Sequence, residues 1–304
     1  MKIKDLERVI FTPGLCRQSL TSDYYEVENT VVVGTTGSGK STLMQAIAKS
    51  IIDSNDASQF NLAYFDMYDK EESPLCNPNR IIPCMQIMKC IREEAFACLD
   101  YNDRVSQFLA YLPMLAKFGM STVDEDEYHA GMRDSMLIVI IDGFDKLGDF
   151  YRDAVFATMK LTNRIKFILG LQSSVLVRDY LDLIPYRIVT RTHNPKDSDK
   201  VLGCNLGYTQ ADAWGTCWFK DERNPFIYKK YEVEYIPNSF LNRVTKVYAS
   251  GYKNTNSIVV DYENMLYKMN TYLEWIKELL QDKSADLARF VYYILSEEGT
   301  RYED

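Results

Sequence analysis

Residues 30–42 read TVVVGTTGSGKST, and this stretch decides the fold. Segment 30–33 is a short apolar run of the strand type, and the pattern G-x-x-x-x-G-K-[ST] follows it from Gly34 to Ser41. Glycines let successive backbone N–H groups point at phosphate oxygens, and a helix that starts at the lysine adds the positive end of its dipole. A strand, this loop and a helix in this order predict an α/β domain that binds a nucleotide.

The residues of the loop have separate expected tasks. Lys40 reaches the β- and γ-phosphates, and the hydroxyl of Ser41 is a ligand of Mg²⁺. ATP and Mg²⁺ are therefore the expected cofactors. The expected nucleotide-binding set is Gly34, Thr35, Thr36, Gly37, Ser38, Gly39, Lys40, Ser41 and Thr42.

A second buried strand is expected to end in an acid, because a phosphate-binding loop needs a carboxylate to hold the Mg²⁺ shell. Asp142 follows the apolar run 137–141 and fits this role, the alternative being a turn or cap residue. In many ATPases of this kind the next residue is a glutamate that orients the attacking water, but here it is Gly143. Asp145 is the nearest replacement, and it is either the catalytic base or a surface acid that caps the next helix.

Gln172 follows the strand-like segment 165–171. A polar side chain at the tip of a strand beside the phosphates can sense the γ-phosphate and hold the attacking water. The alternative is a loop amide with ordinary hydrogen bonds. The candidate catalytic set is therefore Lys40, Asp142, Asp145 and Gln172.

Strand-like and helix-like segments alternate along most of the chain. Strands are expected at 30–33, 62–65, 136–141, 165–171 and 186–190, with two more between 214 and 235, and helices at 41–52, 83–118, 149–161 and 175–183. Such alternation indicates a mostly parallel sheet with helices on both faces. We expect a lead-in segment at 1–28, an ATPase domain at 29–237 and a mainly helical C-terminal extension at 238–304.

Composition limits the class of protein. The net charge of −8 argues against a chain coated in nucleic acid, although a local basic groove is compatible with it. Seven cysteines without a CxxC pair, and only two histidines, make a zinc site an unexpected feature and favour free thiols in a reducing cytosol. The sequence contains neither a secretory signal nor an apolar run of the ~20 residues that a membrane span needs. We therefore expect a cytoplasmic protein, which a membrane-protein partner recruits if it works at a membrane.

Several motifs together resemble the FtsK/SpoIIIE family, within the wider FtsK/HerA group of P-loop ATPases. They are VVVGTTGSGKS at 31–41, VIIDGFDKL at 139–147, FILGLQSS at 167–174 and IPYRIVTRTHNPKDSDKVLG at 184–203. The first is specific only for the superfamily, and the last is the run that points to this family. The order and spacing of the motifs agree over roughly residues 25–237.

The resemblance implies a RecA-like fold and a homo-oligomer, in this family a hexameric ring with ATP at the subunit interfaces. By matching motif, the family roles carry over to Lys40, Ser41, Asp142 and Gln172. Gly143 departs from the family pattern and puts the rate of hydrolysis in doubt.

Four basic residues are candidates for a role at a subunit interface or at the phosphates. Two are the arginines of the IPxRIxxR segment, and the alternative for them is an ordinary salt bridge. The family's trans-acting arginine falls on Leu161 here, so a basic neighbour would have to serve with a shift in alignment. The four candidates are Arg187, Arg191, Lys160 and Arg164.

Two functions remain open at this point. The first is a motor that translocates double-stranded DNA in chromosome or mobile-element (conjugative) transfer. The second is a catalytically weak ATP-binding module of a type VII-like secretion machine that recruits a secreted protein substrate. Gly143 favours the second, whereas the complete loop and Gln172 favour the first. A viral packaging ATPase is a weaker third interpretation.

Overall fold

The computed structural model describes residues 9–13, 24–55, 60–68, 105, 109, 112–113, 116, 136–209, 215–233 and 235–237. These residues fall into two compact units. The larger unit contains the described parts of 9–68, 136–147 and 166–237, and the smaller contains 148–165 with the described residues between 105 and 116. The statements below concern these residues only.

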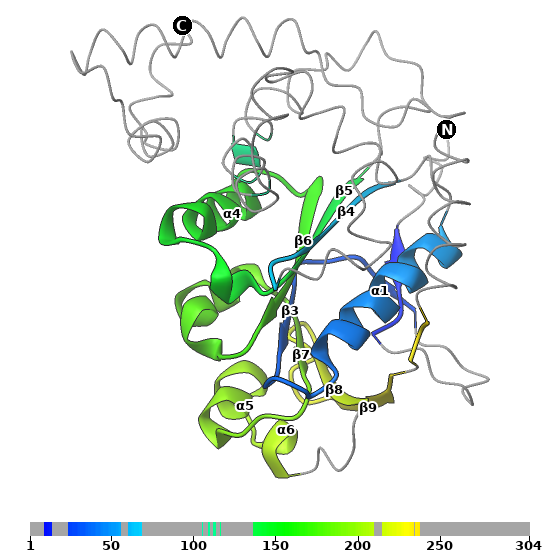
Figure 1. The fold of residues 1–304 in the computed structure, drawn as a ribbon, viewed down its shortest axis with the longest axis vertical. Coiled ribbons are helices and arrows are strands. Elements are labelled where there is room, and N and C mark those ends of the chain that lie inside the picture. Colours follow the sequence, from blue (N-terminus) through cyan, green and yellow to red (C-terminus); the bar gives the residue numbers. More distant parts are fainter. Residues whose placement is uncertain are drawn as a thin grey trace, which may run out of the picture. The chain divides into compact units, whose positions relative to one another are not determined.

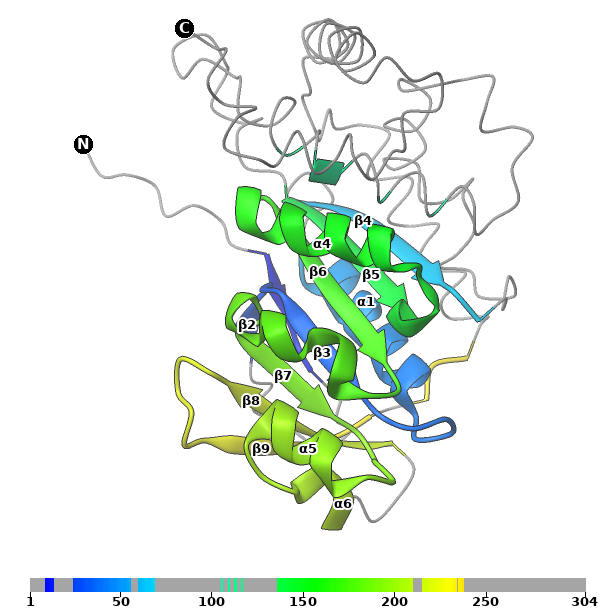
Figure 2. The same ribbon diagram turned by 90° about the vertical axis from the view of Figure 1, so that its left-hand side faces the viewer.

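A seven-stranded sheet forms the centre of the larger unit (Figures 1 and 2). In spatial order its strands are β4 (Phe60–Asp66), β5 (Met136–Asp142), β6 (Ile165–Leu171), β3 (Thr30–Val33), β7 (Tyr186–Val189), β8 (Thr216–Asp221) and β9 (Tyr228–Glu232). β4 runs parallel to β5, and β3 runs parallel to both β6 and β7. β8 and β9 are antiparallel additions. The predicted mostly parallel sheet is confirmed.

Helices cover both faces of this sheet. Helix α1 (Lys40–Ser54) lies on one face, and the 3₁₀ helix η5 (Ser174–Leu183) with helix α5 (Pro195–Leu202) lies on the other (Figure 2). β3 and β6 are buried along their whole length, as expected for parallel strands covered on both sides. The apolar stripe of α1 that faces the core is Leu43, Ile47 and Ile51, as its spacing predicts.

The predicted bounds differ from the structure in a few places. Segment 175–183 is a 3₁₀ helix rather than an α-helix, whereas α4 (Asp149–Leu161), in the smaller unit, begins and ends where it was predicted. α5, α6 (Leu206–Thr209) and the antiparallel pair β1 (Ile10–Phe11) and β2 (Tyr25–Glu26) were not predicted. Most of the helical segment 83–118, and the whole extension 238–304, lie outside the described residues.

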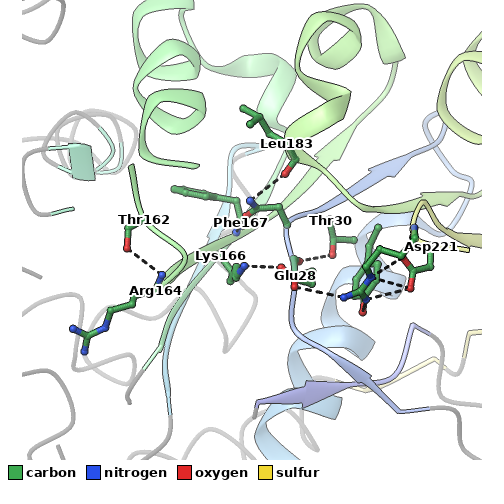
Figure 3. A network of polar contacts seen from close by, with 11 residues as sticks. Glu28, Thr30, Thr162, Arg164, Lys166, Phe167, Leu183 and Asp221 are labelled. Carbon is green, nitrogen blue, oxygen red and sulfur yellow. Dashed lines mark hydrogen bonds and ion pairs between the residues drawn. The ribbon is translucent and has the colours of Figure 1, made fainter. Parts of the chain in front are cut away.

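A network of polar contacts joins the amino ends of β3 and β6, two central strands of the sheet (Figure 3). Glu28 accepts from Lys166 Nζ at 2.5 Å and lies 3.8 Å from Arg223 in the β8–β9 turn. The Asn29 side chain accepts from the Phe167 N–H at 3.0 Å. These contacts fix β3 between its neighbours at the end opposite to the phosphate-binding loop. No helix in the described part of the chain is both long and apolar enough to cross a membrane.

Candidate nucleotide site

The phosphate-binding loop is tied to the ends of the two strands that flank β3. The Gly34 N–H donates to the Leu171 carbonyl at 3.0 Å, at the end of β6. The N–H and the hydroxyl of Thr35 both donate to the Arg191 carbonyl, at 3.0 and 3.1 Å, just beyond β7. The loop is therefore held at the carboxyl edge of the parallel strands, where α/β proteins bind their ligands.

Gly34 allows this close packing. A Cβ at this position would lie 1.7 Å from Thr190 Oγ1 and 2.6 Å from Ser38 Oγ. Those two hydroxyl oxygens are themselves 2.8 Å apart and hydrogen-bonded, so they hold the middle of the loop against β7. Any side chain at position 34 would break this contact.

A cavity of about 430 Å³ opens above the loop. Its size lies in the range typical of small-ligand sites. Seven loop residues and two residues from neighbouring strand ends line it, namely Thr35, Thr36, Gly37, Gly39, Lys40, Ser41, Thr42, Tyr68 and Gln172. The structure thus brings most of the expected nucleotide-binding set to one cavity. Gly34 and Ser38 do not line it but pack against Thr190.

Lys40 and Asp142 form a buried ion pair beside this cavity. Lys40 Nζ lies 2.6 Å from Asp142 Oδ1, and the two side chains are 6% and 0% exposed. Asp142 Oδ2 is also buried and has no hydrogen-bond partner among the described residues. A buried oxygen of this kind needs a partner, and a hard cation is a suitable one. Ser41, which lines the same cavity, supplies the second oxygen expected for Mg²⁺.

The described residues contain no group of three or more His, Cys, Asp or Glu that could hold a metal ion by themselves. Mg²⁺ in proteins keeps water and phosphate ligands and takes only one or two ligands from the chain. Ser41 and Asp142 therefore fit an ion that arrives with the nucleotide phosphates.

Gly143, at the position of the expected glutamate, lies in a conformation that excludes most side chains. Its φ is 90°, in the left-handed region, and a Cβ would lie 2.9 Å from Tyr68 Cε2 and 3.2 Å from Met67 Cβ. The ring of Tyr68 thus occupies the space beside the end of β5 that a side chain at 143 would need.

Tyr68 connects two of the predicted site residues. Its hydroxyl donates to Asp145 Oδ1 at 3.2 Å and accepts from Gln172 Nε2 at 3.1 Å. Lys40 Nζ lies 5.0 Å from the centre of its ring, within the range of a cation–π contact. Burial raises the pKa of Tyr68 to about 12, so the hydroxyl keeps its proton at neutral pH.

Sequence reasoning missed Tyr68, because no motif marks it. The signal lies in the position of β4, which ends at Asp66 opposite Asp142 in the register of β4 and β5. A residue just beyond β4 must therefore lie near the end of β5, but this follows only once the two strands are known to be neighbours.

The two arginines of the 184–203 segment have different surroundings. Arg187 donates to the carbonyls of Leu181, Ile184 and Val201, and it forms an ion pair with Glu222 at 2.5 Å. Burial lowers the pKa of Arg187.

Arg191 is exposed, and within the described ranges its side chain forms no ion pair or hydrogen bond. Its carbonyl, however, holds Thr35 at the edge of the cavity. Arg191 is therefore the better placed of the two to contact a ligand or another subunit.

Lys160 and Arg164 belong to the smaller unit. Lys160 lies in the last turn of α4, and Arg164 lies in the turn before β6, where its N–H donates to Thr162 Oγ1 at 3.1 Å (Figure 3). Both residues stay candidates for the trans-acting role.

Comparisons with known proteins bear on the family resemblance and on the fold. The model of the FtsK/SpoIIIE family matches residues 5–132, which confirms the resemblance noted in the sequence. No curated protein matches the chain.

Solved structures share its fold. The cytoplasmic domain of the type VII secretion ATPase EccC from Thermomonospora curvata aligns with a TM-score of 0.53 and 16% identity, over 79% of this chain and 31% of that one. EccC ATPases 2 and 3 from the same organism, in complex with a signal sequence peptide, align with a TM-score of 0.50 and 13% identity, over 83% and 49%. The pCW3 conjugation coupling protein TcpA with ATPγS aligns with a TM-score of 0.49 and 14% identity, over 79% of this chain and 71% of that one. The chain thus spans less than half the length of the EccC structures. At these identities the likeness to the two EccC structures shows the fold, which is that of RecA-like P-loop ATPases.

Proposed function

We propose that this chain, which resembles the FtsK/SpoIIIE ATPases in sequence and in fold, hydrolyses ATP with Mg²⁺ to move a polymer. The observation that carries the proposal is the Lys40–Asp142 pair at the phosphate-binding loop, with one Asp142 oxygen buried and unsatisfied. A lysine for phosphate and an acid for the metal shell are what phosphoryl transfer from a nucleotide requires.

The loop performs the binding step. Backbone N–H groups of 35–42 and the amino end of α1 surround the phosphates, and Lys40 exchanges its contact with Asp142 for the β- and γ-phosphates. Ser41 and Asp142 would hold Mg²⁺, which supplies charge neutralisation at the β- and γ-phosphate oxygens when bound. Asp142 thereby gains a partner for its second oxygen.

Gln172 serves the hydrolytic step. Its side chain lines the cavity and would hold the water that attacks the γ-phosphorus, while the bond to the β,γ-bridging oxygen breaks to give ADP and inorganic phosphate. Without an acid at 143, we expect turnover about 10²- to 10⁴-fold below that of an enzyme with a water-orienting carboxylate.

Double-stranded DNA is the polymer that the family resemblance favours, in chromosome or conjugative transfer. The motor would be a ring-forming homo-oligomer, in which a basic residue at the subunit interface helps to neutralise the phosphates. Arg191, exposed beside the loop of its own chain, suits a contact with the phosphates or with a neighbouring subunit, and Lys160 and Arg164 are the candidates for the trans-acting role. We place the motor in the cytoplasm, with a membrane-protein partner that recruits it.

A secreted protein is the second candidate for the polymer. EccC, which shares the fold, has been solved with a signal sequence peptide. Here the β8–β9 turn exposes Phe226 to 93% and Ile227 to 55%, and apolar side chains at such a tip suit a peptide better than a phosphate backbone.

One experiment separates these functions. Steady-state ATP hydrolysis with Mg²⁺ is measured alone, with long double-stranded DNA and with a signal-sequence peptide, for wild type and Lys40→Ala. A motor on DNA predicts stimulation by DNA that falls steeply with salt and is lost in Lys40→Ala. Stimulation by the peptide alone selects the secretion function. Turnover in wild type no higher than in Lys40→Ala, under every condition, rules out the motor.

A further inference from the structure

We propose that Tyr68 and Asp145 form a hydrogen-bond relay that fixes the orientation of the Gln172 side-chain amide, so that its carbonyl oxygen faces the attacking water. Tyr68 and Asp145 are positioning residues in this scheme, because they act through Gln172. The inference rests on the proposed function for its catalytic consequence, but the relay itself is a property of the described site.

The backbone fixes the position of Tyr68. Its N–H donates to Asp66 Oδ1 at 2.9 Å, and the Met67 N–H donates to the Asp142 carbonyl at 2.8 Å. The first contact holds Tyr68 in a turn at the end of β4, and the second binds this turn to the end of β5. The phenol ring therefore lies against Gly143, in space that a side chain at position 143 would otherwise occupy.

The chemistry of the three groups fixes the direction of each hydrogen bond. An ionised carboxylate only accepts, so the single hydroxyl proton of Tyr68 must go to Asp145. The phenol oxygen is then left as an acceptor, and Gln172 must present its NH₂ group to it. The amide oxygen Oε1 consequently points away from Tyr68, and no residue of the described chain donates a hydrogen bond to it.

This orientation has a consequence for hydrolysis. A water that donates a hydrogen bond to Gln172 Oε1 turns a lone pair towards the γ-phosphorus, whereas the flipped amide would offer that water an N–H and turn its lone pair away. The two relay bonds, 3.2 and 3.1 Å, are longer than the best bonds of their kind. Catalytic hydrogen bonds often shorten when substrate binds, and the relay has room to do so.

The relay also gives Asp145 a task that differs from direct base catalysis. A base at Asp145 must touch the water, and its effect would be independent of Tyr68. A relay member acts only while the Tyr68 hydroxyl is present. The two roles therefore make opposite predictions about a double variant.

The kinetic test is a double-mutant cycle with Tyr68→Phe, Asp145→Ala and the combined variant. The relay predicts that each single change lowers kcat about tenfold or more, because Gln172 loses its orientation. The Kd for ATP should stay within about threefold of wild type, because the phosphate-binding loop is unchanged. The combined variant should be no slower than Tyr68→Phe, since the pathway is already broken. Losses that multiply would overturn the relay, as would full kcat in Tyr68→Phe.

Tyr228→Phe is the matched control. It removes a hydroxyl that donates to the Leu202 carbonyl at 3.1 Å, and that hydroxyl does not line the cavity. Unchanged kcat in this variant excludes a general effect of removing one tyrosine hydroxyl.

A second measurement tests the relay without turnover. The side-chain NH₂ signal of Gln172, identified by its loss in Gln172→Glu, is followed by NMR. Asp145→Ala should shift this signal in wild type, because Tyr68 transmits the change, and should leave it in place in the Tyr68→Phe background. An unmoved signal in wild type, or equal shifts in both backgrounds, rejects the relay. If Lys40→Ala equals wild type in ATP turnover, the proposed function fails while this measurement still decides the relay.

Discussion

The ring of Tyr68 closes the space beside Gly143: a Cβ on that glycine would lie 2.9 Å from Tyr68 Cε2. A side chain at position 143, directly after Asp142, would meet two obstacles, the contact with the ring and a φ of 90°. The local structure therefore leaves no room for a glutamate at this position.

Gly143→Glu should therefore destabilise the protein and leave turnover no higher than in wild type. A non-glycine residue at this φ and a sub-van-der-Waals contact together should cost about 2–4 kcal/mol in the free energy of unfolding. Urea unfolding and steady-state ATP hydrolysis check the two parts. Adding Tyr68→Ala should recover only the part due to the contact. A Gly143→Glu protein of wild-type stability with faster turnover would contradict the geometry.

Lys40→Ala should lose both nucleotide binding and stability. It leaves Asp142 buried without its cation, which typically costs about 3–5 kcal/mol. The expected result is a lower Tm that ATP and Mg²⁺ no longer raise, measured by thermal unfolding with and without the ligands.

The double variant Lys40→Met/Asp142→Leu separates the two losses. Replacing both partners of a buried pair by apolar groups of similar size is often neutral for stability. We expect a Tm close to that of wild type and no response to ATP. A double variant as unstable as Lys40→Ala would mean that the pair is not the source of the instability.

Alanine in place of Arg187 should mainly lower stability, whereas alanine in place of Arg191 should leave stability almost unchanged. Arg187→Ala removes bonds to three carbonyls and an ion pair with Glu222, and should cost about 2 kcal/mol of stability. Arg191→Ala should change stability by less than about 0.5 kcal/mol, because the side chain is exposed, but should lower turnover if it reaches the next subunit. Urea unfolding beside ATP hydrolysis tests both, and equal losses of stability would contradict the contrast.

Stability should fall as the pH rises from about 10 to about 12. Burial raises the pKa of Tyr186 to about 12, whereas an unfolded tyrosine titrates near 10. Between these values the folded state holds a proton that the unfolded state has lost, so stability is fully present below pH ~10 and declines above it.

Tyr186→Phe should flatten this decline, and Tyr68→Phe should do so as well, because the pKa of Tyr68 is also raised to about 12. The slopes of unfolding free energy against pH, from urea curves between pH ~9 and ~11.5, check this linkage. Slopes equal to that of wild type in both variants would be inconsistent with it.

The sequence predicted the elements whose signals are local. Strands 30–33 and 165–171 have the predicted bounds because they are continuous apolar runs buried on both faces. The loop could be interpreted residue by residue, because its chemistry depends on spacing alone. Helix α5 also carried a local signal, since Asn194 caps it and Pro195 occupies its first turn, but the segment was interpreted only as part of a family motif.

The remainder depends on contacts between distant segments. Tyr68 enters the site because β4 pairs with β5 in a register that opposes Asp66 to Asp142. Arg187 donates hydrogen bonds to carbonyls of η5 and α5, and no sequence motif predicts the positions of those carbonyls. Neither position can be derived from residue type or spacing, because each is set by which strands become neighbours.

The ion pair between Lys40 and Asp142 joins residues 102 positions apart. In the sheet, β6 lies between β3 and β5, so the loop at 34–42 meets its counterpart only after a strand that comes later in the chain has inserted. Such non-local pairings form slowly, whereas a helix such as α1 can form early. We therefore expect the loop to gain its affinity for ATP late in folding, once β6 has paired with β3.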